Sequence, residues 1–146
     1  LIINNNGKIK SFKNEDLKLE YRNSSIDENS IVLKADFNIA YSKQSEIIDK
    51  NNFIKSQRIN SQPIKQKTSG STFKNPPNEF AAVLIEKSGC KGMKIGGASI
   101  STLHSNFIIN NGSATATDIE NLGKTVINKV QKKFGITLDW EIKIIG

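Results

Sequence analysis

The stretch TDIENLGKTVINKVQKKFG, from Thr117 to Gly135, decides the fold because it carries a complete helix pattern. Apolar residues recur along it at helical spacing, namely Ile119, Leu122, Val126, Val130 and Phe134. Side chains at this spacing share one face, so the pattern predicts an amphipathic helix with a buried stripe. Thr117 and Glu120 match a capping box at its start, and Gly135 ends it.

The residues that follow this helix alternate between apolar and polar side chains. The apolar positions are Ile136, Leu138, Trp140, Ile142 and Ile144. Alternation with a period of two predicts a final strand from Ile136 to Ile145. Glu141 would point away from the apolar face of that strand, which makes it a candidate for the solvated side.

Three shorter elements are predicted before the helix. Asn78 to Ser88 reads as a helix, with Asn78 as its cap and Gly89 after its end. Two strands are predicted downstream, the first from Met93 to Ile100 with an interruption at Gly96-Gly97, and the second from Asn106 to Asn110.

The first half of the chain predicts a hairpin, a strand, a helix and a long loop. Leu1–Ile3 and Lys8–Phe12 flank an Asn-Gly turn, which is typical of a β-hairpin. The later elements are a strand with one buried face at Ile31–Ala40, a helix at Ser42–Arg58 and a loop at Asn60–Pro77 that holds all 3 prolines. Together these elements predict an α+β fold, a small mixed sheet packed with helices and preceded by further strands.

Length and composition narrow the class of protein. The chain has 146 residues, 36% of them hydrophobic and 24% charged, which suits one soluble domain or one domain with a piece of another. No apolar run has the length of a membrane span. The lone Cys90 cannot form an intramolecular disulfide, which favours a reducing cytoplasmic location. Since the first residue is Leu1 and not methionine, we expect either a processed product or a piece of a longer protein.

The net charge of +7 raises the alternative of a basic RNA-binding protein. Arg22 and Arg58 are the only arginines among the 21 basic residues, and the lysines are scattered. Arginine is the preferred residue for planar recognition of phosphates and bases. We therefore predict no nucleic-acid partner, although a positive surface would attract an anionic small molecule such as a nucleotide diphosphate.

The loop segment Gly70-Ser71-Thr72-Phe73-Lys74-Asn75-Pro76 concentrates groups that bind or react. Ser71 beside a glycine can present its hydroxyl from a loop. Pro76 disfavours the helical region for Asn75, whose amide is both a donor and an acceptor. The segment is a candidate site, with an ordinary capped turn as the structural alternative.

Other kinds of site find little support. One His and one Cys cannot build a closed zinc site, so no metal is expected. Ser71 and His104 could belong to a hydrolase triad, but the serine lies outside a Gly-x-Ser-x-Gly elbow. The glycine-rich segment Gly89–Gly97 matches neither the Walker pattern of phosphate-binding loops nor the dinucleotide-binding fingerprint.

Read together, these segments make the chain resemble the carboxyl-terminal half of the UDP-N-acetylenolpyruvoylglucosamine reductase family. The similarity includes Tyr21–Ser24, Gln62–Pro63, Gly70–Pro76, Ile95–Ser101, His104–Phe107 with Asn110, Ala114–Asp118, Phe134–Ile136 with Leu138, and Glu141–Gly146. These ordered blocks cover essentially the whole chain.

The resemblance implies a flavoenzyme of peptidoglycan synthesis, in which a hydride from NADPH reaches an enolpyruvyl UDP-sugar by way of FAD and yields UDP-N-acetylmuramate. It assigns proton donation to Ser71, stabilisation of the developing negative charge to Arg22, and support of the intermediate's carboxylate to Glu141. It assigns contacts with the UDP-sugar to Tyr21, Asn75 and His104.

The resemblance also implies two domains, with residues 1–41 as the tail of an FAD-binding domain and residues 42–146 as the substrate-binding domain. Most of the flavin pocket would lie upstream, so we expect the chain to need an amino-terminal flavin domain as partner and to be inactive alone. Some relatives carry a phosphate-binding lysine where Ser61 and Gln62 stand, and Arg58, Lys65 or Lys67 could replace it. The second hypothesis is a non-enzymatic UDP-sugar-binding module or decayed fragment.

Overall fold

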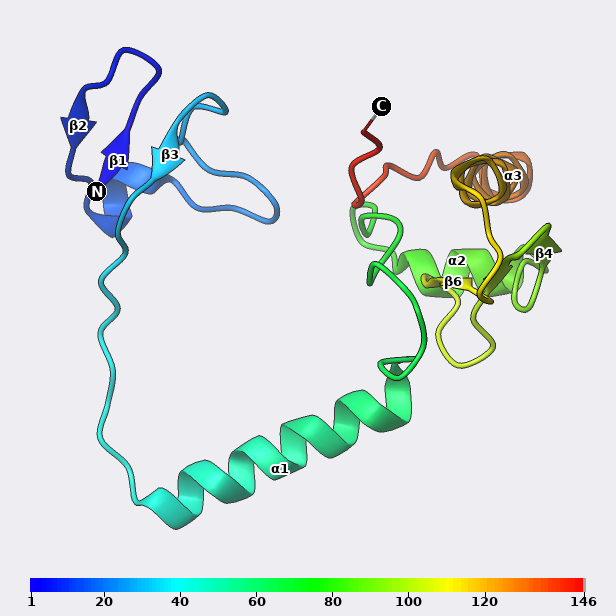
Figure 1. Cartoon of the computed structure of the whole chain (residues 1–146), viewed down its shortest axis with the longest axis horizontal. Helices are drawn as coiled ribbons and strands as arrows, with labels where there is room; N and C mark the ends of the chain where they lie inside the picture. Colours follow the sequence, from blue (N-terminus) through cyan, green and yellow to red (C-terminus); the bar gives the residue numbers. More distant parts are fainter. Residues whose placement is uncertain (146) are drawn as a thin grey trace. The chain divides into compact units, whose positions relative to one another are not determined.

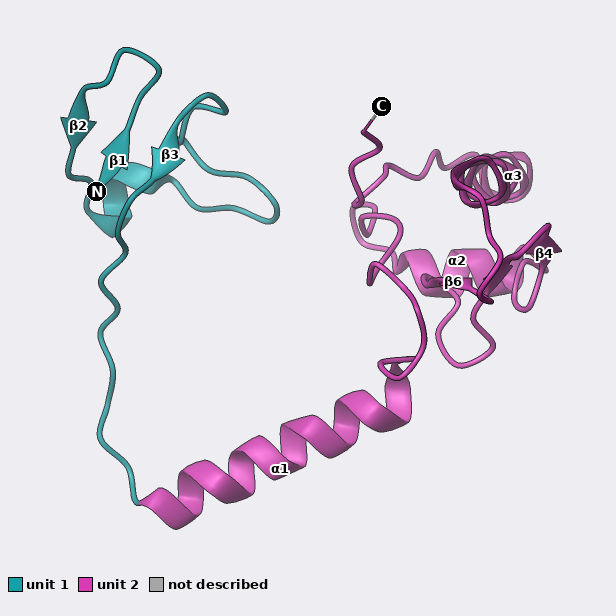
Figure 2. Cartoon of the chain, viewed as in Figure 1, with its two compact units in different colours: residues 1–43 teal, residues 44–146 magenta. Residues whose placement is uncertain are grey.

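The computed structural model describes residues 1–145 and divides into two compact units, Leu1–Lys43 and Gln44–Gly146 (Figure 2). Gly146, the last residue of the predicted second domain, lies outside the described residues. Within residues 1–145, no helix is long and apolar enough to cross a membrane.

Unit 1 contains a small antiparallel sheet in the order β2-β1-β3. Its strands are β1 (Ile2–Ile3), β2 (Ile9–Lys10) and β3 (Ile31–Val32). A turn joins β1 to β2, where the Gly7 N–H donates to the Asn4 carbonyl over 3.0 Å and Gly7 takes a φ of 73°. Because glycine reaches positive φ without steric cost, the Asn-Gly turn forms as expected, and the predicted hairpin is confirmed.

The strand predicted from Ile31 to Ala40 is wrong beyond its first two residues. Only Ile31 and Val32 pair, as β3 against β1. The alternating apolar residues are exposed, and Phe37 and Ile39 keep 82% and 83% of their surface accessible. Alternation indicates a face suited to burial, but within residues 1–145 nothing covers these two side chains.

Unit 2 combines three helices with a second small sheet (Figure 1). The helices are α1 (Gln44–Ser61), α2 (Ala81–Lys87) and α3 (Ala116–Phe134), and the strands are β4 (Lys94–Ile95), β5 (Ala98–Ile100) and β6 (Ile108–Asn110). The strand order is β4-β5-β6. The α+β class is confirmed, and both sheets are antiparallel where a mixed sheet was expected.

The core of unit 2 forms where α3 packs against the sheet and against α2. The predicted apolar stripe of α3 supplies Leu122, Val126 and Val130 to this core, each fully buried. The remaining core residues are Phe73, Ala81, Leu84, Ile85, Cys90, Ala98, Ile100, Ile108 and Leu138. Burial of this stripe accounts for most of the stability of α3, because helices in proteins are stabilised mainly by tertiary packing of an amphipathic face.

The start of α3 lies two residues before the predicted one. Thr115 is the cap, its hydroxyl accepts the Asp118 N–H over 3.1 Å, and Asp118 accepts the Thr115 N–H over 3.0 Å. Asp118 also accepts the Gly97 N–H over 3.2 Å, which ties the helix start to the sheet. Gly135 ends the helix in the left-handed conformation as predicted.

The helix predicted from Asn78 begins instead at Ala81, as α2. Asn78 takes a φ of 60°, a left-handed conformation that a helical residue cannot have. The strand predicted from Met93 to Ile100 is a hairpin, because Gly96-Gly97 forms a turn between β4 and β5.

The final strand predicted from Ile136 to Ile145 pairs only at Trp140, which forms an isolated bridge with Phe73. The two rings pack with their centroids 4.9 Å apart. Trp140 also covers Gly123 of α3, where any side chain would overlap the indole ring. Ring packing and the backbone hydrogen bonds on either side of Trp140 together hold this segment to the rest of unit 2.

Candidate functional site

Ser71 lies in a short extended segment held by backbone hydrogen bonds on both sides. It forms an isolated antiparallel bridge with Phe107. The next residue, Thr72, donates its N–H to the Asn106 carbonyl over 2.8 Å and accepts the Glu141 N–H over 2.9 Å. Backbone hydrogen bonds to two segments that are distant in the sequence therefore hold the Gly70–Pro76 loop, which was predicted as a candidate site.

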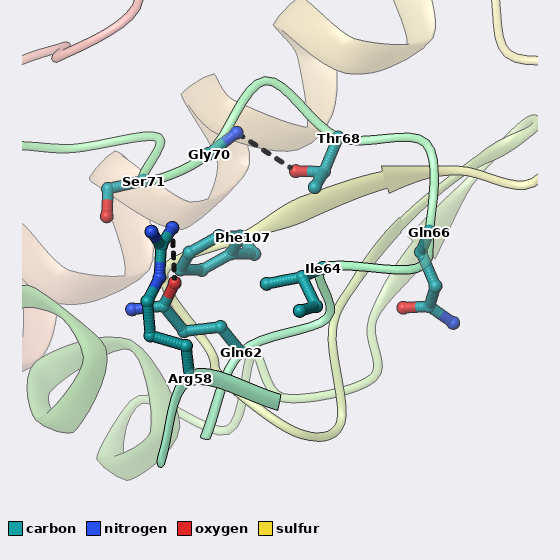
Figure 3. A pocket seen from close by; sticks show the side chains of 8 residues that line it. All are labelled: Arg58, Gln62, Ile64, Gln66, Thr68, Gly70, Ser71 and Phe107. Carbon is teal, nitrogen blue, oxygen red and sulfur yellow. Dashed lines mark hydrogen bonds between the residues drawn. The ribbon is translucent and has the colours of Figure 1, made fainter. Parts of the chain in front are cut away.

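Ser71 lines a cavity of about 430 Å³ within unit 2 (Figure 3). The other lining residues are Arg58, Gln62, Ile64, Gln66, Thr68, Gly70 and Phe107. A volume of this size falls within the range of small-molecule pockets, roughly 300–1,000 Å³. Most of the lining residues come from the loop predicted at Asn60–Pro77. Binding residues often lie on loops that a packed scaffold holds in place.

Arg58 brings a positive charge to this cavity. It stands in the last turn of α1, and its side chain extends toward the Gly70-Ser71 loop (Figure 3). Its Nη2 atom donates to Gln62 Oε1 at 3.5 Å. A guanidinium keeps its charge at any physiological pH and matches the geometry of phosphate and carboxylate oxygens, so this side of the cavity suits an anion.

The two lysines considered alongside Arg58 lie elsewhere. Lys65 lines a neighbouring cavity of about 270 Å³. Lys67 contributes its carbonyl, which accepts the Asn110 N–H over 2.9 Å. Neither lysine lines the cavity of Ser71, which leaves Arg58 as the basic residue there.

Asn75 has a structural contact in addition to its predicted binding role. Its Oδ1 atom accepts the Ala81 N–H at 3.0 Å and so satisfies a free backbone donor at the start of α2. Asn75 is exposed and does not line the cavity of Ser71.

His104 is half-buried and supports the segment that pairs with Ser71. Its Nδ1 atom accepts the Asn106 N–H at 3.3 Å, and its ring meets the edge of Phe107 with centroids 4.8 Å apart. Burial lowers the pKa of His104, because desolvation disfavours the imidazolium. The neutral ring suits its role as an acceptor at Nδ1.

Glu141 follows Trp140 and adjoins the Ser71 segment through its backbone. Its N–H donates to the carbonyl of Thr72, the neighbour of Ser71. Its side chain is partly buried, with the Oε2 atom removed from solvent. The structure therefore brings the backbone of Glu141 close to that of Ser71.

Tyr21 and Arg22 belong to unit 1, whereas Ser71, Asn75, His104 and Glu141 belong to unit 2. The two residues form the tip of a tight turn closed by hydrogen bonds between Glu20 and Asn23. Arg22 takes a φ of 57° and lies over the Tyr21 ring at 5.4 Å. This arrangement leaves Tyr21 63% exposed.

Sequence reasoning did not single out Phe107 or Thr68 as cavity residues, because nothing local distinguishes a pocket residue from a core or loop residue. Arg58 carried a detectable signal, as one of two arginines in a lysine-rich chain. No group of three or more potential metal ligands occurs in the described part of the chain.

Comparisons with known proteins show a consistent family. The family profile described as "UDP-N-acetylenolpyruvoylglucosamine reductase, C-terminal domain" matches residues 62–145. A UDP-N-acetylenolpyruvoylglucosamine reductase of Rickettsia conorii is 46% identical over 140 residues, covering 96% of this chain and 48% of the relative. The enzyme of the same name from Rickettsia bellii (strain RML369-C) is 45% identical, with 96% and 46% covered.

A solved structure agrees with this result. The crystal structure of UDP-N-acetylenolpyruvylglucosamine reductase from Thermus caldophilus superposes with a TM-score of 0.81 at 32% identity, covering 98% of this chain and 51% of that one. The chain spans about half the length of the relatives it matches. It belongs to the UDP-N-acetylenolpyruvoylglucosamine reductase family, whose carboxyl-terminal domain it contains.

Proposed function

We propose that this chain is the substrate-binding and proton-donating part of a reductase that converts UDP-N-acetylglucosamine enolpyruvate to UDP-N-acetylmuramate in peptidoglycan synthesis. The observation that carries the proposal is the cavity that the Ser71 hydroxyl and the positively charged Arg58 both line. A hydroxyl beside a cation in a partly enclosed site suits an anionic substrate that must receive a proton.

The chemistry explains the residue types. Hydride addition to the terminal vinyl carbon leaves negative charge on the adjacent carbon and its carboxylate. In the proposal Ser71 donates a proton to that carbon and regains one from solvent, while Arg22 stabilises the charge and Glu141 supports the carboxylate. Preorganised charges of this kind act where charge develops in the transition state.

Binding of the nucleotide part is proposed for four further residues. In the proposal, Tyr21, Asn75 and His104 contact the UDP-sugar, and Arg58 binds its diphosphate. The cavity supports Arg58, because a guanidinium forms paired hydrogen bonds with phosphate oxygens. The roles of Tyr21 and Arg22 rest on the family resemblance.

The family resemblance implies that most of the flavin site lies upstream of this chain, and we propose that the described residues supply only its end. FAD and NADPH would supply the hydride when bound by the longer protein. We propose residues 1–41 as the end of its flavin-binding domain and residues 42–146 as its substrate-binding domain, in a cytoplasmic enzyme.

Calorimetric titration of the chain with UDP-N-acetylglucosamine enolpyruvate tests the binding part. We expect Arg58→Ala to weaken binding about tenfold or more, a difference of about 1.4 kcal/mol. Lys50→Ala is the matched control, because it removes one positive charge from the same helix outside the cavities described here. Failure of the wild-type chain to bind, or equal affinity of both variants, would contradict the proposed role. A short RNA in the same titration tests the basic-protein alternative.

Turnover tests the catalytic part. The purified chain with FAD, NADPH and substrate should give no steady NADPH oxidation, and addition of the amino-terminal half should produce it. In the combined enzyme we expect Ser71→Ala to lower kcat roughly 10²- to 10⁴-fold, as loss of a proton donor does. Ser56→Ala, on an exposed part of α1, serves as the control. Unchanged kcat for Ser71→Ala would remove Ser71 from that role.

A further inference from the structure

Asn106 is a buried polar residue that neither the cavity nor the predicted site includes. It is 4% exposed and stands in the segment that pairs with Ser71. The oxygen and the nitrogen of its side-chain amide both form hydrogen bonds with the backbone of Phe73. Asn106 Oδ1 accepts the Phe73 N–H at 2.9 Å, and Asn106 Nδ2 donates to the Phe73 carbonyl at 2.8 Å.

The geometry of the Ser71 segment explains why Phe73 needs this partner. Phe73 and Trp140 are an antiparallel pair whose hydrogen bonds lie on their neighbours, since Lys74 donates to Asp139 and Glu141 donates to Thr72. In such a pair the N–H and C=O of Phe73 point to the opposite side. They are buried there, and without the amide of Asn106 each would lose its hydrogen bond.

Asn106 therefore holds the Ser71 segment at three points. Besides the two side-chain bonds, its own carbonyl accepts the Thr72 N–H at 2.8 Å. The Thr72 hydroxyl adds a fourth link by accepting the Ile108 N–H at 3.2 Å. These bonds lie one and two residues from Ser71, so they fix the backbone from which its hydroxyl projects.

We propose that Asn106 is a positioning residue that fixes the Ser71 hydroxyl for proton transfer through its paired hydrogen bonds to the Phe73 backbone. The inference rests on the proposed function for the role of Ser71, and on the hydrogen bonds of Asn106 to Phe73 and Thr72 for the positioning itself. A displacement of about 1 Å at a reacting group can cost on the order of 10²-fold in rate. The hydrogen bonds from Asn106 to Phe73 and Thr72, here called the Asn106 clamp, thus affect the rate of the chemical step and leave substrate affinity nearly unchanged.

Asn106→Asp tests the clamp with almost no change in shape. The carboxylate still accepts the Phe73 N–H but repels the Phe73 carbonyl, whereas a protonated carboxyl can donate to it again. In ¹⁵N–¹H spectra of the chain we expect the Ser71 and Phe73 amides to shift at about pH 8 and to return toward wild type at about pH 5, because burial and the facing carbonyl favour the protonated form. Asn111→Asp, which makes the same exchange at a residue bonded to Ser99, should leave both amides unchanged.

The kinetic arm uses the full-length reductase containing this chain. Asn106→Asp should lower kcat about 10- to 100-fold at about pH 8 with KM changed less than threefold, and Asn111→Asp should match wild type. A folded Asn106→Asp enzyme with wild-type kcat and Ser71 amide at both pH values would overturn the proposal. Asn106→Ala, which buries no charge, is the second variant, and unfolding of both variants at every pH would make Asn106 a folding residue and likewise overturn it. If the wild-type enzyme does not reduce the sugar nucleotide, the proposed function fails, while the spectra still decide whether Asn106 positions Ser71.

Discussion

Asn75 combines a predicted binding role with an observed structural hydrogen bond. The predicted role is contact with the UDP-sugar, and the observed contact is with the Ala81 N–H through Oδ1. An Asn side chain has an acceptor at one end and two donors at the other. The two roles therefore require different atoms, and substitution can separate them.

We predict that Asn75→Ala lowers the free energy of unfolding by about 1 kcal/mol, because the Ala81 N–H loses its acceptor. Asn75→Asp keeps the acceptor and adds a negative charge near the start of α2, so its stability should remain close to wild type. Both variants lose the amide donors and should bind the sugar nucleotide more weakly. Urea unfolding and calorimetry measure the two effects, and equal stability of both variants would contradict the structural role.

His104 should make stability depend on pH near neutrality. Because burial lowers the pKa of folded His104 below its unfolded value of about 6.5, the unfolded chain binds the proton more readily. Stability is therefore full above the unfolded pKa and falls as pH decreases through it toward the folded pKa. We predict that wild type loses more unfolding free energy than His104→Gln between about pH 7.5 and about pH 5.5. Parallel pH profiles of the two proteins would contradict this assignment.

At the scale of elements, the apolar pattern of α3 predicts that a helix forms but does not determine the residue at which it starts. Both Thr115-x-x-Asp118 and Thr117-x-x-Glu120 fit a capping pattern, and the structure uses the first. The Gly97 N–H favours that choice, because it donates to the same Asp118 carboxylate that accepts the Thr115 N–H. A tertiary contact thus decides between two local solutions.

This choice gives a direct test. Thr115→Ala should lower the free energy of unfolding by about 1 kcal/mol, within the roughly 0.5–2 kcal/mol typical of a lost helix cap. Thr117→Ala should have little effect, because Thr117 stands inside the helix and alanine favours helices. Thermal or urea unfolding of the pair compares them, and a larger loss for Thr117→Ala would support the start predicted from sequence.

At the scale of the whole molecule, two helices of similar length differ in what they bury. α1 spans 18 residues with none buried, whereas α3 spans 19 residues and buries Leu122, Gly123, Val126 and Val130. A helix without tertiary packing is marginal in water. Under the proposed function, the exposed apolar residues of α1 and of unit 1 would be available for contact with an amino-terminal half.

We predict that the amide hydrogens of α1 exchange at least about 100-fold faster than those of α3 in the isolated chain, because local opening of α1 exposes no core. Hydrogen exchange followed by mass spectrometry measures both helices in one sample, so α3 is an internal control. Protection of α1 equal to that of α3 would contradict the prediction. Protection gained by α1 when the amino-terminal half is added would locate part of the contact surface.

The sequence by itself determined the α+β class, the buried stripe of α3, the Asn-Gly hairpin and the family. Each depends on local periodicity, on a glycine that must take a positive φ, or on short blocks of sequence that occur in the same order as in the family. The irregular segment before α2 was also predictable, because its prolines and glycines disfavour helix and strand.

Only the tertiary structure decided which residues line the cavity of Ser71. Arg58 and Phe107 reach the cavity of Ser71 from distant parts of the chain, and Asn106 reaches Phe73 across 33 residues. The single pairing of Trp140, in place of a full strand, likewise depends on the packing of its ring against Phe73 and Gly123. Contacts of this kind leave no periodic trace, because the free energy that selects them comes from burial and hydrogen bonding between segments that meet only in the folded chain.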